Sequence, residues 1–190
     1  MKNKQTLIDT IYLDMDGVIA NVQALASALT KWMSWDMLSQ QERLKIQSYL
    51  IHYKKDFFQQ VPPYEHTEKL YKLCKKYALH VRFLSCFTPD SETKFERVTQ
   101  DKRDWIHRYI DPDIPDSDII VVRRKKHKYS INSGLLIDDN PKNIKLWRAH
   151  NGIGIIFKNL NNCAYQLESL NFRKKPCKST LFHTVLQKQR

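Results

Sequence analysis

The segment from Ile11 to Val18 ends an apolar run with two aspartates one residue apart and follows them with a glycine. Side chains at positions i and i+2 of a strand point to the same side, so Asp14 and Asp16 would leave the strand end together. Unpaired buried carboxylates are unfavourable, and a bound cation is the usual compensation. Gly17 permits backbone conformations that other residues resist, so the chain can turn sharply here. The segment therefore predicts a buried strand that ends in a chemical site.

Short apolar runs alternate with amphipathic segments along the rest of the chain. Strands are expected near residues 7–13, 79–84, 118–122, 135–137 and 152–157, and helices near 22–33, 39–53, 64–77, 91–110, 140–150 and 163–170. This alternation is typical of a parallel sheet with helices on both faces, which binds ligands at the carboxyl ends of its strands. We therefore expect an α/β fold with a doubly wound parallel sheet.

One stretch departs from the alternation. Residues 20–61 hold helical patterns but no strand pattern, and they follow the acidic pair directly. Within them, Ser39 with Glu42 three residues later predicts a capping box at the start of a helix. We expect a small helical cap at 20–61, inserted after the first strand of a core made of residues 1–19 and 62–170. A basic C-terminal tail, residues 171–190, would follow.

Three further strand ends carry groups that can join the first aspartates. Ser85 and Cys86 end the second expected strand, the basic run 123–128 follows the third, and Asp138 and Asp139 end the fourth. The carboxyl ends of parallel strands meet at one edge of the sheet, so these groups are expected to gather there. Carboxylates without histidine partners suit Mg²⁺, which prefers oxygen ligands. Such a site can hold a phosphate, and one carboxylate can attack its phosphorus.

Four short motifs resemble those of the haloacid dehalogenase-like (HAD) phosphohydrolases. They are, in order, Asp14-Met-Asp16-Gly-Val, Leu84-Ser85, Lys128, and Leu135-Leu-Ile-Asp138-Asp139. The pair Phe57-Phe58 followed by Val61-Pro62-Pro63, and the stretch 135–157, resemble the 5'(3')-deoxyribonucleotidases in particular. The resemblance covers about residues 7–170. It implies a HAD-like Rossmannoid core with a helical cap.

The resemblance also implies a role for each matched acid. Asp14 would be the nucleophile that forms an aspartyl-phosphate, and Asp16 would be the general acid/base. Asp139 would be a direct ligand of Mg²⁺ together with Asp14, with Asp138 supporting it and Asp16 contributing its backbone carbonyl.

Phosphate would be held by Ser85 and Lys128, with Cys86 beside them. Lys128 lies ten residues before Asp138, a spacing that fits the family, and Lys125 and Lys126 are alternates. The segment Ser85-Cys86-Phe87 stands where the family often has Thr-Ser-Pro, which leaves the base preference open.

Two aromatic residues, Phe57 and Phe58, are candidates for the substrate pocket because either ring could stack on a base. Aromatic residues at a cap hinge are also ordinary core, so both interpretations stay open.

Together these features favour a Mg²⁺-dependent phosphatase, a phosphoric monoester hydrolase, acting on (deoxy)nucleoside monophosphates. The net charge of +12 suits anionic substrates and also nucleic acid. A phosphatase for the terminal phosphates of DNA or RNA is therefore the first alternative. A non-catalytic nucleic-acid or partner-binding module is the second, disfavoured because every catalytic side chain is present.

Composition limits where in the cell the protein is expected and which partners it is expected to bind. No apolar run reaches the roughly 20 residues of a membrane helix, and the N-terminal ten residues lack the apolar region of a signal peptide. We therefore expect a cytoplasmic protein without a membrane partner. The four cysteines are widely spaced and predict free thiols. A nucleotide is the expected small-molecule partner, and a homodimer is left open.

Overall fold

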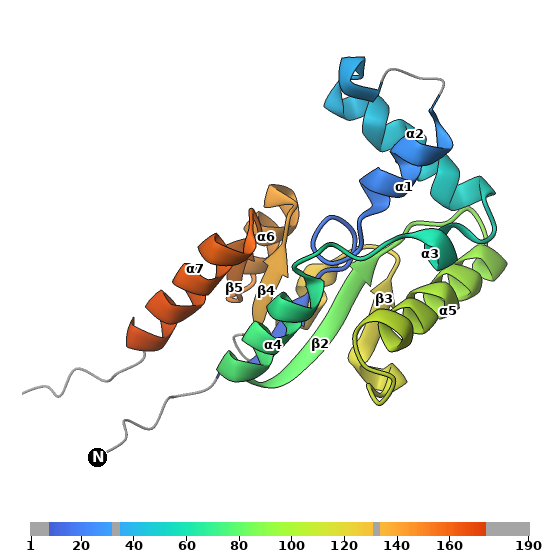
Figure 1. Ribbon diagram of the computed structural model, residues 1–190. Coiled ribbons are helices and arrows are strands. Elements are labelled where there is room, and N and C mark those ends of the chain that lie inside the picture. Colours follow the sequence, from blue (N-terminus) through green and yellow to red (C-terminus); the bar gives the residue numbers. More distant parts are fainter. Residues whose placement is uncertain (1–7, 32–34, 131–133, 174–190) are drawn as a thin grey trace, which may run out of the picture.

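The computed structural model describes residues 8–31, 35–130 and 134–173. Within these ranges, five parallel strands form one sheet in the order β3-β2-β1-β4-β5 (Figure 1). The strands are β1 (Ile8–Leu13), β2 (Ala78–Cys86), β3 (Ile119–Val122), β4 (Leu135–Asp138) and β5 (Ile153–Ile156). Because β1 lies at the centre, its carboxyl end is flanked by the ends of β2 and β4.

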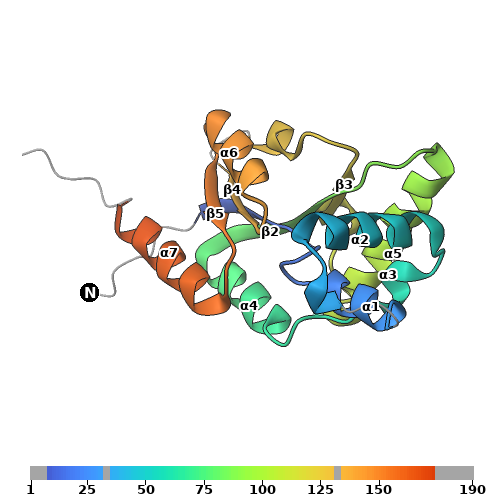
Figure 2. The same ribbon diagram turned by 90° about the horizontal axis from the view of Figure 1, so that it is seen from above.

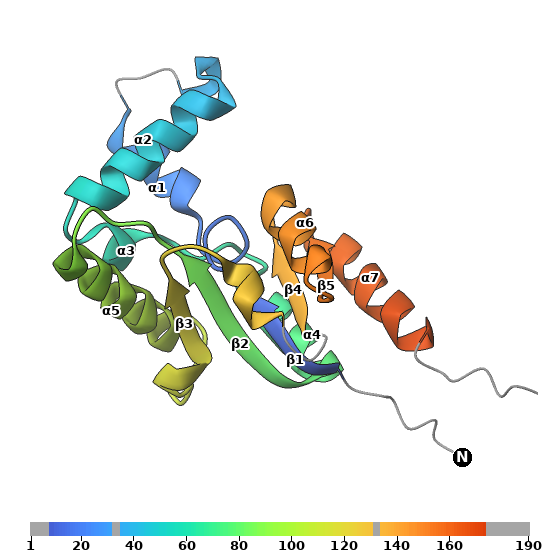
Figure 3. The same ribbon diagram turned by 180° about the vertical axis from the view of Figure 1, so that it is seen from behind.

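Helices cover both faces of this sheet (Figures 1 and 3). One face carries α4 (Thr67–Tyr77), α5 (Glu92–Tyr109) and α7 (Leu160–Arg173), and the other carries η3 (Lys126–Tyr129) and α6 (Pro141–Ala149). The alternation of side chains along β1 explains the two cores: Ile11 and Leu13 belong to the larger cluster, whereas Tyr12 packs with Trp147 of α6 in the smaller one. The expected doubly wound sheet is confirmed.

The segment between β1 and α4 contains only helices among its described residues. It consists of α1 (Val22–Leu29), η1 (Trp35–Met37), α2 (Gln40–Tyr53) and α3 (Phe57–Gln60). These elements stand above the carboxyl ends of the strands, on the side of α5 and away from α7 (Figure 2). The capping box predicted for α2 is present, with the Glu42 backbone N–H donating to Ser39 Oγ and the Ser39 backbone N–H donating to the Glu42 carboxylate.

The two connections of this segment to the sheet run side by side. The backbone N–H of Asn21 donates to the carbonyl of Pro62 at 2.8 Å, and the N–H of Tyr64 donates to the carbonyl of Ile19 at 3.0 Å. We call these paired connections the neck. The neck joins residues 22–60 to the sheet through two adjacent strands of chain, beside the end of β1.

The expected elements are present, with shifts at their ends. β2 runs two residues further than expected, because Ser85 and Cys86 pair with β3. The helix expected from residue 22 to 33 ends at Leu29, and the one expected from 64 begins at Thr67, after the neck. Residues 174–190 of the expected tail lie outside the described residues. None of the described helices combines the length and apolar character needed to cross a membrane.

Candidate active site

The turn after β1 sends its two acidic side chains in different directions. Asp14 is buried, and its Oδ1 accepts a hydrogen bond from the backbone N–H of Met15 at 2.8 Å. Gly17 has φ of +83°, a region that side chains disfavour. A Cβ atom at Gly17 would lie 2.3 Å from Asp139 Oδ2. Glycine is therefore required here both for the turn and for the approach of Asp139.

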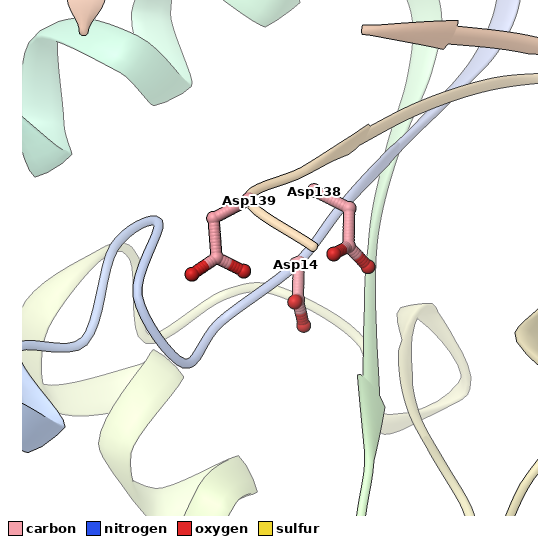
Figure 4. Close-up of side chains that lie close together, drawn as sticks. All are labelled: Asp14, Asp138 and Asp139. Carbon is pink, nitrogen blue, oxygen red and sulfur yellow. The ribbon is translucent and has the colours of Figure 1, made fainter. Parts of the chain in front are cut away.

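Three carboxylates converge where β1 and β4 end. One oxygen each of Asp14, Asp138 and Asp139 lies within 4.8 Å of the others (Figure 4). Asp138 is fully buried and accepts hydrogen bonds from the backbone N–H of Asn140 at 2.8 Å and from Asn143 Nδ2 at 2.9 Å. Asp139 is exposed. We call these three side chains the acid cluster.

A buried lysine bridges two members of the acid cluster. Lys126 Nζ lies 2.7 Å from Asp14 Oδ1 and 2.8 Å from Asp138 Oδ2. The preceding residue, Lys125, has φ of 68°, a left-handed conformation that is uncommon outside glycine. The chain turns there, and the side chain of Lys126 enters the site while that of Lys125 stays exposed.

The lysine expected to hold phosphate, Lys128, is not the one in the site. Its side chain is exposed, and the alternate Lys126 contacts Asp14 instead. Both belong to η3, a 3₁₀ turn with three residues per turn, so positions two apart point to different sides. The turn sets the direction of each side chain, so Lys126 and not Lys128 lies beside Asp14.

Asp16 lies outside the acid cluster and pairs with Lys102, a lysine that the motifs did not indicate. Lys102 Nζ of α5 donates to both carboxylate oxygens of Asp16, at 2.7 and 2.8 Å. The Lys102 side chain is 0% exposed, and its Nζ lies 4.0 Å from the centre of the Phe58 ring. The metal contact expected from the backbone carbonyl of Asp16 stays a prediction.

A signal for Lys102 was present in the sequence. It follows Val98 by four residues and precedes Trp105 and Ile106 by three and four, so it shares the apolar stripe of α5. A lysine on the buried face of a helix needs a carboxylate partner.

At the end of β2, Ser85 and Cys86 differ in their surroundings. Ser85 is buried, and its Oγ has no hydrogen-bond partner among the described residues. The Cys86 thiol donates to the carbonyl of Arg123 at 3.4 Å. Partial burial raises the pKa of Cys86, which favours the neutral thiol. Ser85 thus has a free hydroxyl for a ligand, while Cys86 is engaged with the backbone after β3.

The aromatic pair Phe57 and Phe58 lies in the core. Each residue is 1% exposed, and the two rings meet edge to face with their centres 5.5 Å apart. The structure therefore offers no open ring face to a base at these positions. Phe58 reaches the site indirectly, because its ring lies against the Lys102 ammonium group.

Burial and mutual repulsion dominate the electrostatics of the acid cluster. Burial raises the pKa of Asp14 well above its usual range although Lys126 opposes the shift. Partial desolvation of the Asp139 carboxylate by the surrounding protein, together with the charge of Asp138, raises the pKa of Asp139 to about 6. Burial alone would lower the pKa of Lys126, but Asp14 and Asp138 outweigh it and raise that pKa above its usual range. One lysine therefore does not fully compensate the cluster.

The donor set fits a hard divalent cation. The cluster offers three carboxylates and no histidine or cysteine, which is the chemistry that Mg²⁺ and Ca²⁺ select. A divalent ion would relieve the repulsion that raises the pKa of Asp139, and the exposure of Asp139 would leave such an ion accessible.

Comparison with protein-family models matches residues 8–171 to a family described as 5' nucleotidase, deoxy (pyrimidine), cytosolic type C protein. The chain belongs to this family. The type C 5'-nucleotidases are phosphoric monoester hydrolases, so the resemblance to the 5'(3')-deoxyribonucleotidases and the enzyme class are confirmed.

Similarity to a solved structure supports the fold. A hydrolase from Streptococcus pneumoniae TIGR4 shares 13% identity with this type C family member, with 86% of this chain and 100% of that chain covered and a TM-score of 0.50. A predicted HAD-like family hydrolase from Porphyromonas gingivalis shares 15% identity over 87% and 98% of the two chains, with a TM-score of 0.40. A search of curated proteins gives no match.

Proposed function

We propose that this chain is a Mg²⁺-dependent phosphatase that removes phosphate from (deoxy)nucleoside monophosphates through an aspartyl-phosphate on Asp14. One observation carries the proposal: the contact of buried Asp14 with Lys126, at 2.7 Å, beside two further carboxylates. This contact places the proposed nucleophile, Asp14, next to the ammonium group of Lys126 and next to Asp138 and Asp139, which could bind a metal. Membership of a 5'-nucleotidase family supports the nucleotide substrate.

In the proposed first step, an oxygen of Asp14 attacks phosphorus and the bond from phosphorus to the nucleoside oxygen breaks. Asp16 gives a proton to the departing oxygen. In the second step Asp16 takes a proton from water, whose oxygen attacks the same phosphorus. Inorganic phosphate leaves, and the Asp14 carboxylate is restored.

Several groups could hold the phosphate during these steps. Lys126 can donate to a phosphoryl oxygen, and the unpartnered Ser85 Oγ supports a second donor at the end of β2. Asp14, Asp138 and Asp139 would hold Mg²⁺, which supplies positive charge next to the phosphoryl oxygens. Lys102 orients Asp16, because its ammonium group is fixed to both oxygens of that carboxylate.

Hydrolysis of thymidine monophosphate tests the proposal. We expect release of phosphate that requires Mg²⁺ and stops with EDTA, and we expect Asp14→Asn to lower the rate by about a thousandfold or more. Asp9→Asn is the matched control, since Asp9 is an exposed acid on the same strand. Full activity of Asp14→Asn would overturn the mechanism. A wild-type protein that hydrolyses neither this nucleotide nor an aryl phosphate would instead indicate a non-catalytic binding module.

A further inference from the structure

The surface next to the acid cluster is strongly and almost uniformly basic. Residues 123–150 contain eight lysines and arginines and only two acids, Asp138 and Asp139, both of which belong to the acid cluster. This segment forms η3 and α6, which lie together on one face of the sheet at the ends of β1 and β4 (Figure 3). We call one part of this segment the basic face. It consists of the exposed residues Arg124, Lys125, Lys142, Lys145, Leu146 and His150 and of the half-buried His127.

The cations of the basic face are not neutralised by the protein. Arg124, Lys125, Lys142 and Lys145 form no ion pair with any acid in the described parts of the chain. On α4, by contrast, Lys72 pairs with an acid of its own helix. An ordinary solvated surface mixes both signs, whereas a surface of one sign attracts a polyanion.

A hollow connects the basic face to the catalytic groups. It has a volume of about 230 Å³. Its lining residues are Arg124, Lys125, Lys126, His127, Asn143 and Leu146. Two of them also contact the acid cluster, since Lys126 Nζ lies 2.7 Å from Asp14 and Asn143 Nδ2 lies 2.9 Å from Asp138. A phosphate near Asp14 would therefore have the cations of this hollow as its neighbours.

Two imidazole rings add a surface for bases. His127 and His150 stack with their ring centres 4.2 Å apart. Ser130 fixes this arrangement, because its Oγ lies 2.7 Å from the carbonyl of His127 and 2.9 Å from that of His150. Leu146, 48% exposed, lies in the hollow beside His127. Rings interleaved with unpaired cations are the combination with which proteins bind single strands.

We propose that the basic face binds a single strand of nucleic acid whose terminal phosphate enters the site at Asp14. The cations of α6 and η3 contact the backbone phosphates, and the histidine pair stacks on a base. The hydrolysis of that terminal phosphate rests on the proposed phosphatase function, whereas binding of the strand does not. The substrate class is then the phosphorylated end of a strand in addition to a free nucleotide.

Binding is tested without catalysis, by fluorescence anisotropy of labelled oligothymidylate in EDTA. Lys142→Glu with Lys145→Glu should weaken binding about tenfold or more and lower the slope of log affinity against log salt by about 1.4, since each contact to a single strand contributes about 0.7. The matched control is Lys69→Glu with Lys76→Glu, two exposed lysines of α4 on the opposite face. Equal weakening by both pairs would overturn the proposal. The proposal would also be overturned if the protein bound anionic lipid vesicles through Lys142 and Lys145 but did not bind the oligonucleotide.

Turnover gives a separate measurement. Wild-type kcat/KM should be higher for oligothymidylate phosphorylated at one end, 5' or 3', than for thymidine monophosphate, and added salt should reduce this advantage. Lys142→Glu with Lys145→Glu should remove the advantage and change kcat/KM for thymidine monophosphate by less than about twofold. If thymidine monophosphate is hydrolysed but neither oligonucleotide is preferred, the strand proposal fails and the phosphatase stands. If no substrate is hydrolysed while binding still depends on these lysines, the phosphatase fails and the strand-binding face stands.

Discussion

Lys102 Nζ donates to both carboxylate oxygens of Asp16, and the two residues are 86 positions apart in the chain. The pair ties α5 to the turn after β1. It is separate from the contacts of Lys126 with Asp14 and Asp138. The site thus contains two sets of ion pairs, one at Asp14, the proposed nucleophile, and one at Asp16, the proposed acid/base.

Removal of one partner from the Lys102–Asp16 pair should destabilise the fold. Asp16→Ala leaves the ammonium of Lys102 buried without its carboxylate, so the free energy of unfolding should fall by about 1–3 kcal/mol, given that Asp16 is partly exposed. The double variant with Lys102→Met should lose less than the sum of the two single changes. Urea unfolding in EDTA measures this coupling. Strict additivity would show that the pair does not contribute to stability.

Lys126 and Lys128 should differ sharply in their effect on activity. Lys126→Met removes the cation in contact with Asp14, so kcat/KM for thymidine monophosphate should fall about a hundredfold or more. Lys128→Met changes an exposed side chain of the same turn, and kcat/KM should stay within about twofold. Thermal melts should accompany the assays, because Asp14 and Asp138 lose their shared partner in Lys126→Met. A larger loss of activity from Lys128→Met would restore the assignment made from sequence spacing.

The raised pKa of Asp139, about 6, predicts pH-dependent metal binding. A metal needs the ionised carboxylate, so Mg²⁺ affinity should fall by up to about tenfold per pH unit as the pH drops below 6. Without metal, the free energy of unfolding should depend on pH in the opposite direction and fall as the pH rises. The reason is that the folded state holds the Asp139 proton more tightly than the unfolded chain does. The contribution of Asp139 to stability is therefore greatest at low pH and is lost as the pH rises through 6.

Calorimetric titration with Mg²⁺ between pH 5 and 8, at roughly unit intervals around the pKa of Asp139, measures the metal effect. In EDTA, Asp139→Asn should unfold at a higher urea concentration than wild type at pH 7, and this difference should shrink as the pH approaches 4. A Mg²⁺ affinity that is flat across pH 6 would contradict the placement of Asp139 among the ligands.

Gly17→Ala should disturb both the turn and the acid cluster. The new methyl group would lie 2.3 Å from Asp139 Oδ2, and the backbone φ of +83° is unfavourable for alanine. We expect a loss of about 1–3 kcal/mol in the free energy of unfolding together with weaker Mg²⁺ binding. The double variant with Asp139→Ala separates the two causes, since it relieves the clash and leaves the backbone strain. No change in stability for Gly17→Ala would rule out the tight approach of Asp139.

Features that depend on local pattern could be predicted from the sequence. The apolar run before Asp14 marked a strand, and Ser39 with Glu42 marked the start of α2. The proximity of Asp14 to Asp138 and Asp139 could also be predicted, because the carboxyl ends of parallel strands lie at one edge of the sheet.

Features that depend on the direction of a single side chain could not be predicted in this way. The positive φ of Lys125 turns Lys126 into the site in place of Lys128, and no spacing rule encodes that rotation. The partner of Asp16 lies on a helix far along the chain, so the pair with Lys102 exists only once α5 has packed against the sheet.

The neck has a consequence for how substrate choice can diversify. Asn21 with Pro62, and Ile19 with Tyr64, join the ends of the α1–α3 segment by main-chain hydrogen bonds, which place no demand on the identity of the residues between them. We expect that a different insert could be grafted between these positions while the carboxylates below keep their places. Recombination at the neck would then replace the helical segment that stands above the strand ends and leave the carboxylates unchanged.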